Sequence, residues 1–552
     1  MRVQLSLSFV LIPLIPFAVS QSIAAQKYAP VMRPCPAGTQ LVRNVGSDPL
    51  TQLLSPGEER YTQARRSQTL PSAWANYYLN VLQSTSQLLP LYVTQILLGT
   101  LGLDVLPNLG IATSGGGLRA ALFGAGVLSV LDGRNQTSAR AGMGGLLQAA
   151  SYLSGLSGGS WLVLSLSQAN FPTLPEVVFG TSSDVSGEDA FGGWITQFDL
   201  LEPGADANAT AAFASALLEE VSLKWAEGFS VTVTDVWGRS LARHFVNGTT
   251  ADNMFDTNLP HGAGLTMSSL PELPSFREYE QPFPIVLANS IASQPDSSAI
   301  VLNETGVVVP LTNPIYEFNV LIEGIRRTMP QSGIRLDAAQ VPNPFRGFAQ
   351  SSFVDANNDV LTLVDGGEDG ETTPFQPLLV RARGIDTIIA IDAPADTADN
   401  WAAGDSLIAT QDRVKLLSTV YSFPPVPTTQ DEFLAHNLTR QPTFFGCDSS
   451  ASSDEPFVIY LANGGAPLGE APLTNTSTGK LAYTAEEAQA FLDQVHTIAT
   501  QGISLSASDG NVVKDPEWPA CLACAVVDRS RRRLGFSRAG VCVACFERYC
   551  WS

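Results

Sequence analysis

Short apolar runs bounded by glycine-rich or polar turns recur along the chain, and they predict buried strands. These strands are expected over residues 106–113, 283–288, 360–364 and 387–391, and a run that alternates in part predicts another over 316–325. Apolar residues at helical spacing predict helices over residues 72–103, 118–131, 225–245 and 485–503. The candidate catalytic and binding residues lie in glycine-rich turns beside these elements.

Ser157 is the first candidate for chemistry, because it lies between an apolar run (146–153) and a helix-competent run (161–166). The residues around it read Gly-Leu-Ser-Gly-Gly, which matches G-x-S-x-G, the pattern of a nucleophile elbow. A sharp strand-to-helix turn strains the backbone and leaves no room for side chains near the serine. Its hydroxyl would then lie at a helix N-terminus, which favours developing negative charge. A simple Gly/Ser turn is the alternative.

A second glycine-rich turn, Ser114-Gly115-Gly116-Gly117, follows the predicted strand 106–113 and leads into the predicted helix 118–131. Consecutive free N–H groups at a helix N-terminus form an anion nest. The turn lacks both G-x-G-x-x-G and a following G-K-[ST], which excludes a dinucleotide fingerprint and a P-loop. We therefore predict an oxyanion hole at Gly115, Gly116 and Gly117, with Arg119 as a fixed positive charge. A tight turn with a surface arginine is the alternative.

A third turn, Asp365-Gly366-Gly367-Glu368-Asp369-Gly370, follows the predicted strand 360–364. A carboxylate at the C-terminal end of a core strand lies where α/β sheets place ligands and catalytic groups. Asp365 is therefore the predicted base, Asp369 is the fallback, and a common Asp-Gly turn is the alternative. A conventional triad would need His436 or His496, and neither follows a strand with a glycine turn.

Composition narrows the class of protein. The 552 residues are 45% hydrophobic and 15% charged, so most of the chain is expected to fold, with room for a large core or two to three domains. The formal net charge of −21 argues against a nucleic-acid partner and against attraction to anionic membranes through a basic patch.

The first 20 residues predict a secretory signal peptide, with a short basic start, an apolar run over 5–19 and the small-x-small site Ala18-Val19-Ser20. The most apolar later stretch, 88–106, contains polar and charged residues and predicts a core helix. The C-terminus has no hydrophobic tail for a GPI anchor. We therefore expect a secreted protein without a transmembrane helix. Six N-x-[ST] sequons fit a glycoprotein: Asn135, Asn208, Asn247, Asn303, Asn437 and Asn475.

Seven cysteines are present, at Cys35, Cys447, Cys521, Cys524, Cys542, Cys545 and Cys550. The two C-x-x-C pairs near the C-terminus match the spacing of a four-cysteine zinc site. Disulfides are the expected state in an oxidising compartment, so the predicted secretion favours them. Because seven is odd, one thiol should stay free or pair between chains.

The motifs SGGGLRA, GLSGGSW and VDGGEDG, in this order, resemble those of the fungal secreted phospholipase B (lysophospholipase) family, and less closely those of the cytosolic group-IV phospholipases. The similarity extends over most of the chain, and it includes residues 27–43, 282–285, 442–447 and 475–478 and the Cys-rich C-terminus. The chain departs from the family at Leu118, where an aromatic residue is usual. Residues 319–352 are only weakly similar and lack a cysteine.

This resemblance implies a patatin-like, cytosolic-phospholipase-like fold, that is, a three-layer α/β/α hydrolase with a central mixed sheet and large cap insertions. After the signal peptide predicted over 1–20, the catalytic domain would cover 21–552. Within that domain we expect core motifs at 106–165 and 360–392, cap-like insertions at about 170–280 and 319–352, and the Cys-rich C-terminus at 521–552.

The resemblance also implies a Ser-Asp dyad without a cofactor or metal. Ser157 would attack an acyl ester of a phospholipid or lysophospholipid, and Asp365 would take the serine proton and later activate water. Gly115 to Gly117 would hold the oxyanion, and Arg119 would pair with the substrate phosphate. The expected partners are phospholipid and lysophospholipid aggregates or membrane surfaces, with no nucleic acid and no obligate protein partner. A secreted Ser-His-Asp lipase or esterase and a non-catalytic lipid-binding glycoprotein of the same fold are the alternatives.

Overall fold

The structure is a computed structural model of the chain, and the predicted signal peptide, Cys35 and Asn303 lie outside the residues that it describes. The described residues are 22–31, 34, 42–43, 45, 48, 50–181, 191–290, 316–347, 355–448, 454–467, 469–506 and 512–551.

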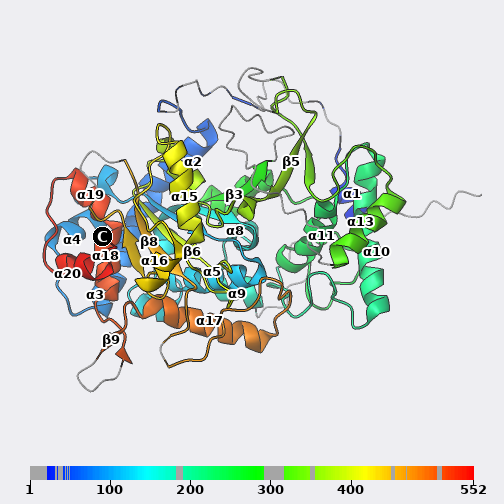
Figure 1. Cartoon of the computed structure of the whole chain (residues 1–552). Coiled ribbons are helices and arrows are strands. Elements are labelled where there is room, and N and C mark those ends of the chain that lie inside the picture. Colours follow the sequence, from blue (N-terminus) through cyan, green and yellow to red (C-terminus); the bar gives the residue numbers. More distant parts are fainter. Residues whose placement is uncertain are drawn as a thin grey trace, which may run out of the picture.

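An eight-stranded sheet forms the centre of the molecule, in the spatial order β4-β5-β3-β2-β1-β6-β8-β7 (Figure 1). In chain order the strands are β1 (Leu109–Thr113), β2 (Ala150–Leu156), β3 (Phe283–Ser290), β4 (Ala339–Pro342), β5 (Val360–Asp365), β6 (Thr387–Asp392), β7 (Thr443–Phe445) and β8 (Phe457–Ala462). The strands β3, β2, β1, β6 and β8 run parallel to one another. At one end β5 is antiparallel to β3 and to β4, and at the other β7 is antiparallel to β8. The sheet is therefore mixed, as predicted.

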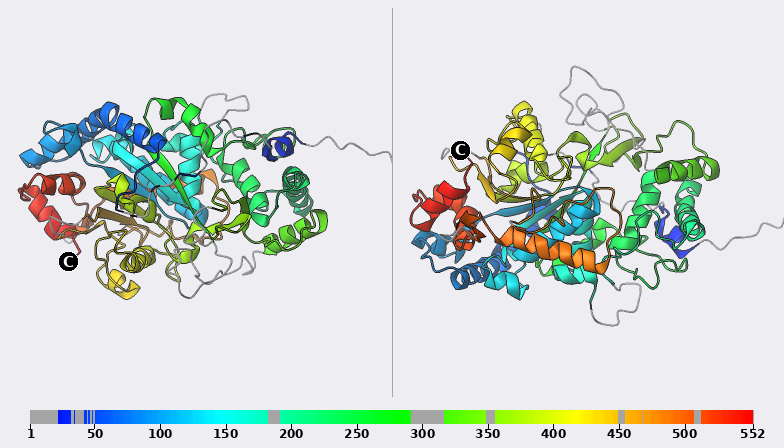
Figure 2. Two further views of the ribbon diagram at one scale, coloured as in Figure 1. Left: turned by 90° about the horizontal axis from the view of Figure 1, so that it is seen from above. Right: turned by 60° about the horizontal axis from the view of Figure 1, so that its bottom comes forward.

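Helices cover both faces of this sheet and give three layers. On one face, α5 (Gly117–Leu131) and α17 (Ala485–Thr500) share a hydrophobic cluster with Ile389 and Ile391 of β6. On the other face, a second cluster joins Ile388 of β6 to α15 (Asp405–Leu416). Neighbouring side chains of one strand enter different cores because successive residues point to opposite faces. Figure 2 shows α17 as the orange helix that crosses one face.

The remaining helices and strands connect or flank these layers. The helices are α1 (Ile23–Tyr28), α2 (Pro56–Gln68), α3 (Leu70–Ser84), α4 (Leu91–Leu97), α6 (Gln136–Arg140), α7 (Leu146–Ala149), α8 (Gly158–Gln168), α9 (Leu174–Phe179), α10 (Ala207–Ala226), α11 (Val233–Phe245), α12 (Pro274–Arg277), α13 (Tyr316–Thr328), α14 (Gln376–Leu379), α16 (Gln430–Ala435), α18 (Trp518–Val526), α19 (Asp528–Arg533) and α20 (Val541–Tyr549). A separate two-stranded sheet pairs β9 (Leu505–Ser506) with β10 (Val512–Val513).

The helices α10, α11 and α13 lie beside the central sheet (Figure 1). A third hydrophobic cluster joins them. The carboxylate of Glu220 is buried next to it and bonds two arginines, Arg239 at 2.8 Å and Arg243. These helices fall largely within the predicted cap-like insertions. A cap role for them remains a prediction.

Several element predictions differ from the structure. The strand predicted over 316–325 is wrong, because this run belongs to α13, where Leu321, Ile322 and Ile325 are buried at helical spacing. The helix predicted over 72–103 is broken, and Pro90 precedes its second part, α4. The helix predicted over 225–245 starts later, because a capping box of Thr232 and Asp235 begins α11.

Burial also differs from prediction in two places. The strand β5 is half-buried rather than buried, because only the edge strand β4 lies beyond it. In the apolar stretch 88–106, Val93 and Ile96 are buried as a core helix requires, but Leu88 and Leu91 are exposed. Within the described ranges, no helix is long and apolar enough to cross a membrane.

Three disulfides tie the C-terminal region together: Cys447–Cys550, Cys521–Cys545 and Cys524–Cys542. The choice of disulfides over zinc is thus confirmed, and the two C-x-x-C pairs are linked to each other. Cys447 is paired with Cys550, which fastens the chain end next to β7.

These bridges differ in the loop that they close, which predicts different contributions to stability. Replacing Cys447 and Cys550 together by alanine should lower the free energy of unfolding by about 4–5 kcal/mol, since the bridge spans 103 residues. Replacing Cys524 and Cys542, which are 18 residues apart, should cost about 3 kcal/mol or less. Urea denaturation of both double variants measures this difference, and equal losses would contradict it. Peptide mapping of unreduced protein checks the three pairings.

Candidate active site

Ser157 occupies a sharp turn between β2 and α8. Its φ is 48° and its ψ is −123°, a region that residues with a side chain rarely adopt. A β-carbon on Gly155 would lie 2.5 Å from the carbonyl oxygen of Gly159, and one on Gly159 would overlap the carbonyl oxygen of Thr113. The flanking glycines are therefore required by close backbone packing. This geometry is that of the predicted nucleophile elbow.

The glycine loop between β1 and α5 lies directly against this serine. A β-carbon on Gly115 would be 2.9 Å from the β-carbon of Ser157, and one on Gly158 would overlap the carbonyl oxygen of Gly117. Gly116 and Gly117 have positive φ values of 128° and 65°, which favour glycine.

The three predicted oxyanion donors are not equivalent. The N–H of Gly115 donates to the carbonyl oxygen of Thr372 at 2.9 Å and is not free for an oxyanion, which corrects that part of the prediction. Within the described part of the chain, no acceptor contacts the N–H groups of Gly116 and Gly117, which stand at the start of α5. An oxyanion hole would therefore use Gly116 and Gly117.

Strand register brings Asp365 level with Ser157. Leu156 of β2 pairs with Leu287 of β3, and the next residue, Ala288, pairs with Asp365 of β5. Ser157 follows Leu156 and is therefore level with Ala288 of β3, while Asp365 pairs with the same Ala288 from the other side of β3. Two strand spacings of about 4.8 Å place their backbones roughly 10 Å apart, which the two side chains can shorten.

The side chain of Leu156 lies where the three turns meet. A β-carbon on Gly366 would be 2.8 Å from it, and one on Gly115 would be 2.9 Å from it. The turns that carry the predicted nucleophile, oxyanion donors and base are therefore in mutual contact. The structure thus brings together the sites that the three motifs predict.

The two aspartates of the third turn have different surroundings. Asp365 is exposed, and its Oδ1 accepts from the N–H of Gly367 at 2.9 Å. Asp369 is only 3% exposed and forms an ion pair with Arg413 at 2.5 Å. Burial and the nearby charge of Asp365 raise the pKa of Glu368. Of the two aspartates, Asp365 is therefore the one accessible to solvent, and Asp369 is paired with Arg413.

Arg119 lies behind the glycine loop rather than on the surface. Its side chain is fully buried, and a β-carbon on Gly116 would be 2.8 Å from its Nη2. The guanidinium donates to the carbonyl oxygen of Ala393 from Nε and Nη2, at 3.2 and 3.0 Å, and to that of Thr476 from Nη1 at 2.6 Å. The alternative of a surface arginine is thus wrong. Phosphate binding stays a prediction, and it would require exchange of a carbonyl partner.

The segment around Thr476 is the part of the site that the motifs did not indicate. Besides accepting from Arg119, Thr476 shares a hydroxyl hydrogen bond with Tyr483. A β-carbon on Gly117 would lie 2.9 Å from the carbonyl oxygen of Thr478. In the sequence this segment carries a sequon and is part of the family resemblance, and neither signal shows that it covers the glycine loop.

The four histidines lie in other settings. Burial lowers the pKa of His244 and of His261 to about 4. His436 is exposed after α16. Burial also lowers the pKa of His496 on α17. Within the described residues, no hydrogen bond joins a histidine to Ser157 or Asp365.

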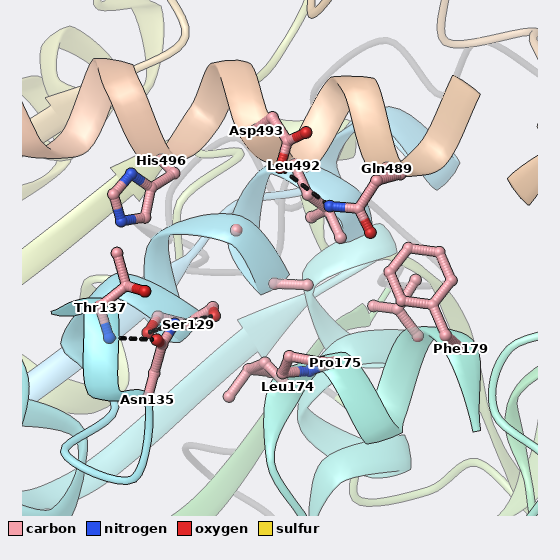
Figure 3. A pocket seen from close by; sticks show the side chains of 13 residues that line it. Ser129, Asn135, Thr137, Leu174, Pro175, Phe179, Gln489, Leu492, Asp493 and His496 are labelled. Carbon is pink, nitrogen blue, oxygen red and sulfur yellow. Dashed lines mark hydrogen bonds between the residues drawn. The ribbon is translucent and has the colours of Figure 1, made fainter. Parts of the chain in front are cut away.

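His496 lines a cavity of about 380 Å³ between α5, α9 and α17 (Figure 3). The cavity contacts α5 from Ala125 onward. That residue is eight positions beyond Gly117, or about 12 Å along the helix. The cavity is therefore not the Ser157 site.

Buried carboxyl groups surround the back of the site. Asp392 accepts from the hydroxyls of Thr373 and Tyr460 at 2.8 and 2.6 Å, and Asp396 accepts from the N–H of Ala403 at 2.7 Å. Burial raises the pKa of both aspartates above the usual carboxyl range. Burial also raises the pKa of Glu371 to about 8, despite the opposing charge of Arg413.

The family model and the curated proteins that this chain resembles are described as lysophospholipases. The family described as "Lysophospholipase catalytic domain" matches residues 109–327 and 317–552. Lysophospholipase 3 of Aspergillus fumigatus is 31% identical, and the alignment covers 96% of this chain and 88% of that protein. A lysophospholipase of Penicillium chrysogenum is 30% identical over 96% of this chain and 90% of its own length. For lysophospholipase 3 of Saccharomyces cerevisiae the figures are 29%, 97% and 84%.

A solved structure has a similar fold. Human GIVD cytosolic phospholipase A2 aligns with a TM-score of 0.56 at 13% sequence identity, over 87% of this chain and 68% of that chain. At this identity the likeness concerns the fold alone. It confirms the predicted α/β hydrolase fold of the patatin-like, cytosolic-phospholipase-like type.

The raised carboxyl pKa values predict a protein that is more stable in acid. Glu371 stays protonated in the folded chain but ionises at its usual pKa in the unfolded chain. Its contribution to the free energy of unfolding is therefore present below about pH 4.5 and is lost as the pH rises through about 8. The thermal midpoint should be higher at pH 5 than at pH 8.5, and Glu371→Gln should reduce this difference. Exposed Glu486→Gln should not, and an equal effect of both variants would contradict the assignment.

Proposed function

This chain belongs to the lysophospholipase catalytic domain family and is a carboxylic ester hydrolase of that type, and we propose that it works through an acyl-serine intermediate. Its proposed substrates are the fatty acyl esters of lysophospholipids and phospholipids in aggregates or membrane surfaces. The observation that carries the mechanism is the strand register that holds Ser157 and Asp365 level, with the glycine loop against the serine.

In the proposed acylation step, Oγ of Ser157 attacks the ester carbonyl carbon while Asp365 accepts the hydroxyl proton. The carbonyl oxygen becomes an oxyanion and accepts from the free N–H groups of Gly116 and Gly117, each worth roughly 3–4 kcal/mol in the transition state. The tetrahedral intermediate expels the alcohol of the substrate, which takes the proton from Asp365. An acyl ester of Ser157 remains.

Water then hydrolyses this ester. Asp365 accepts a proton from the water, whose oxygen attacks the acyl carbon, and the same N–H groups hold the oxyanion. Collapse expels Ser157, which recovers its proton from Asp365, and the fatty acid leaves. The proposed step needs no imidazole, which agrees with the settings of the four histidines.

The proposed role of Arg119 is to bind the substrate phosphate. A guanidinium suits phosphate because it offers donors in a planar fork. A phosphate oxygen would replace the carbonyl of Thr476 on Nη1, while Ala393 keeps Nε and Nη2. Binding of the head group would thereby move the segment that covers the glycine loop.

We also propose that the protein is a secreted glycoprotein, on the basis of the sequence over 1–20 and the sequons. Asn208 and Asn437 are exposed and leave room for a glycan. The side chain of Asn135 instead caps α6, and that of Asn247 packs against Gln168. The disulfides are consistent with an oxidising compartment.

Acyl release from phosphatidylcholine and lysophosphatidylcholine by purified protein tests the dyad. Ser157→Ala should remove essentially all acyl release, because it removes the nucleophile, and Asp365→Asn should lower kcat by roughly 10²–10⁴-fold or more, because it removes the base. Ser160→Ala is the matched control, since its hydroxyl donates to the carbonyl of Ser157, and it should stay active. His436→Ala and His496→Ala should also stay active. Loss of activity in either histidine variant, with Asp365→Asn active, would favour a Ser-His-Asp hydrolase.

Substrate comparison tests the role of Arg119. If it binds phosphate, Arg119→Ala should lower kcat/KM about tenfold or more for lysophosphatidylcholine relative to an uncharged aryl ester, since hydrogen bonds to charged groups are worth about 1.5–3 kcal/mol. Equal losses on both substrates would show that the arginine only supports the glycine loop. The thermal midpoint of the variant reports the structural contribution separately.

A further inference from the structure

The segment 366–373 connects the predicted base to the glycine loop. It begins directly after Asp365 with a short 3-10 turn, Gly366–Asp369. Near its other end, the carbonyl oxygen of Thr372 accepts from the N–H of Gly115 at 2.9 Å. The conformation of this segment therefore affects two positions. One is that of the Asp365 carboxylate, and the other is that of the glycine loop with the free N–H groups of Gly116 and Gly117.

One side chain from another element holds the middle of this segment. Arg413 of α15 bonds Asp369 through Nη2 and Glu371 through Nη1, both at 2.5 Å. The side chains of the three residues are 11%, 3% and 1% exposed, so this bridge is almost fully out of water. Asp369 also accepts from the N–H of Glu371 at 2.9 Å, which closes the turn around the guanidinium.

The helix α15 also bonds the C-terminal end of the segment. The N–H of Thr373 donates to Oγ of Ser406 at 2.7 Å. Ser406 is the second residue of α15, and Arg413 lies seven residues later, which is two helical turns and therefore the same face. The helix thus fixes the segment on both sides of Thr372.

We infer that Arg413 is a positioning residue for hydrolysis: by bridging Asp369 and Glu371 it fixes the segment that places Asp365 and anchors the glycine loop. This inference rests on the proposed role of Asp365. A displacement near 1 Å of a catalytic group can cost 10²-fold in rate, so a small relaxation of this segment is enough to be seen. Arg413 does not contact the reacting atoms in this arrangement.

An arginine suits this place because its planar fork reaches two carboxyl groups at once, whereas lysine offers a single point charge. Burial raises the pKa of Glu371 to about 8, so near neutral pH Glu371 is a protonated member of the bridge. Removing Arg413 leaves Asp369 buried without its counter-charge, and the turn must open to hydrate it.

Kinetics of Arg413→Gln and Arg413→Lys test the inference. The matched control is Arg548, which also bridges two carboxylates, Asp515 and Glu517, but does so on α20 in the C-terminal region. We expect Arg413→Gln to lower kcat for lysophosphatidylcholine at least tenfold with KM within twofold, and Arg413→Lys to restore part of kcat. Arg548→Gln should keep kcat within twofold, although its thermal midpoint also falls.

The outcomes separate this inference from the proposed function. A kcat in Arg413→Gln equal to that in Arg548→Gln, or a rise in KM alone, would overturn the positioning role while Ser157→Ala and Asp365→Asn remain inactive. Full activity of Asp365→Asn would instead remove the proposed function. If Arg413→Gln does not fold, the inference is decided by Arg413→Lys, whose kcat must fall at least threefold at unchanged KM.

Discussion

Close packing of backbone on backbone is the constraint on which this site depends. The turn at Ser157 holds a positive φ, and its neighbours approach so closely that a β-carbon on Gly158 or Gly159 would overlap a carbonyl oxygen of the adjoining loop. Such a turn costs free energy, of order 1–3 kcal/mol for the strained residue, and persists only where the surroundings fix it. Here the surroundings are the glycine loop on one side and the aspartate turn on the other, which meet at the side chain of Leu156.

The order of strands explains how these distant segments meet. β1 and β2 are parallel neighbours, so the loops that leave their carboxyl ends lie at one edge of the sheet. β5 is antiparallel to β3, so its carboxyl end would ordinarily lie at the opposite edge. It reaches the site because it begins beyond the end of β3 and pairs with it only over Ala288 to Ser290. Asp365 is the last residue of β5, and this short overlap stops it level with Ser157.

Short stretches of sequence were sufficient to predict turns and strands that depend on neighbouring residues. The three glycine turns, one of them the nucleophile elbow, and the strands β1, β3, β5 and β6 follow from short motifs and apolar runs, because backbone strain and burial restrict which residues fit there. The strands β4, β7 and β8 were not predicted. The strand predicted over 316–325 was wrong, since an alternating run of few residues does not distinguish a strand from an amphipathic helix. Contacts between distant segments could not be predicted. The sequence near Gly115 does not show that its N–H donates to Thr372, and the sequence near Asp369 does not show that it pairs with Arg413.

Burial of acidic groups has a consequence for chemistry as well as for folding. The chain carries a net charge of −21, and it places several carboxyl groups in the interior next to the site rather than only on the surface. Burial raises the pKa of Asp392, Asp396 and Glu371, so these groups hold protons where ordinary carboxyls are ionised. One buried cation, Arg413, can then bond two acidic side chains, Asp369 and Glu371, because the protonated Glu371 adds no charge to the core. An exposed aspartate as base and a protonated interior both suit acidic surroundings, where an imidazole base would be protonated and inactive. Because a protonated acid carries no charge, these carboxyl groups can be buried beside the site without a counter-charge for each of them.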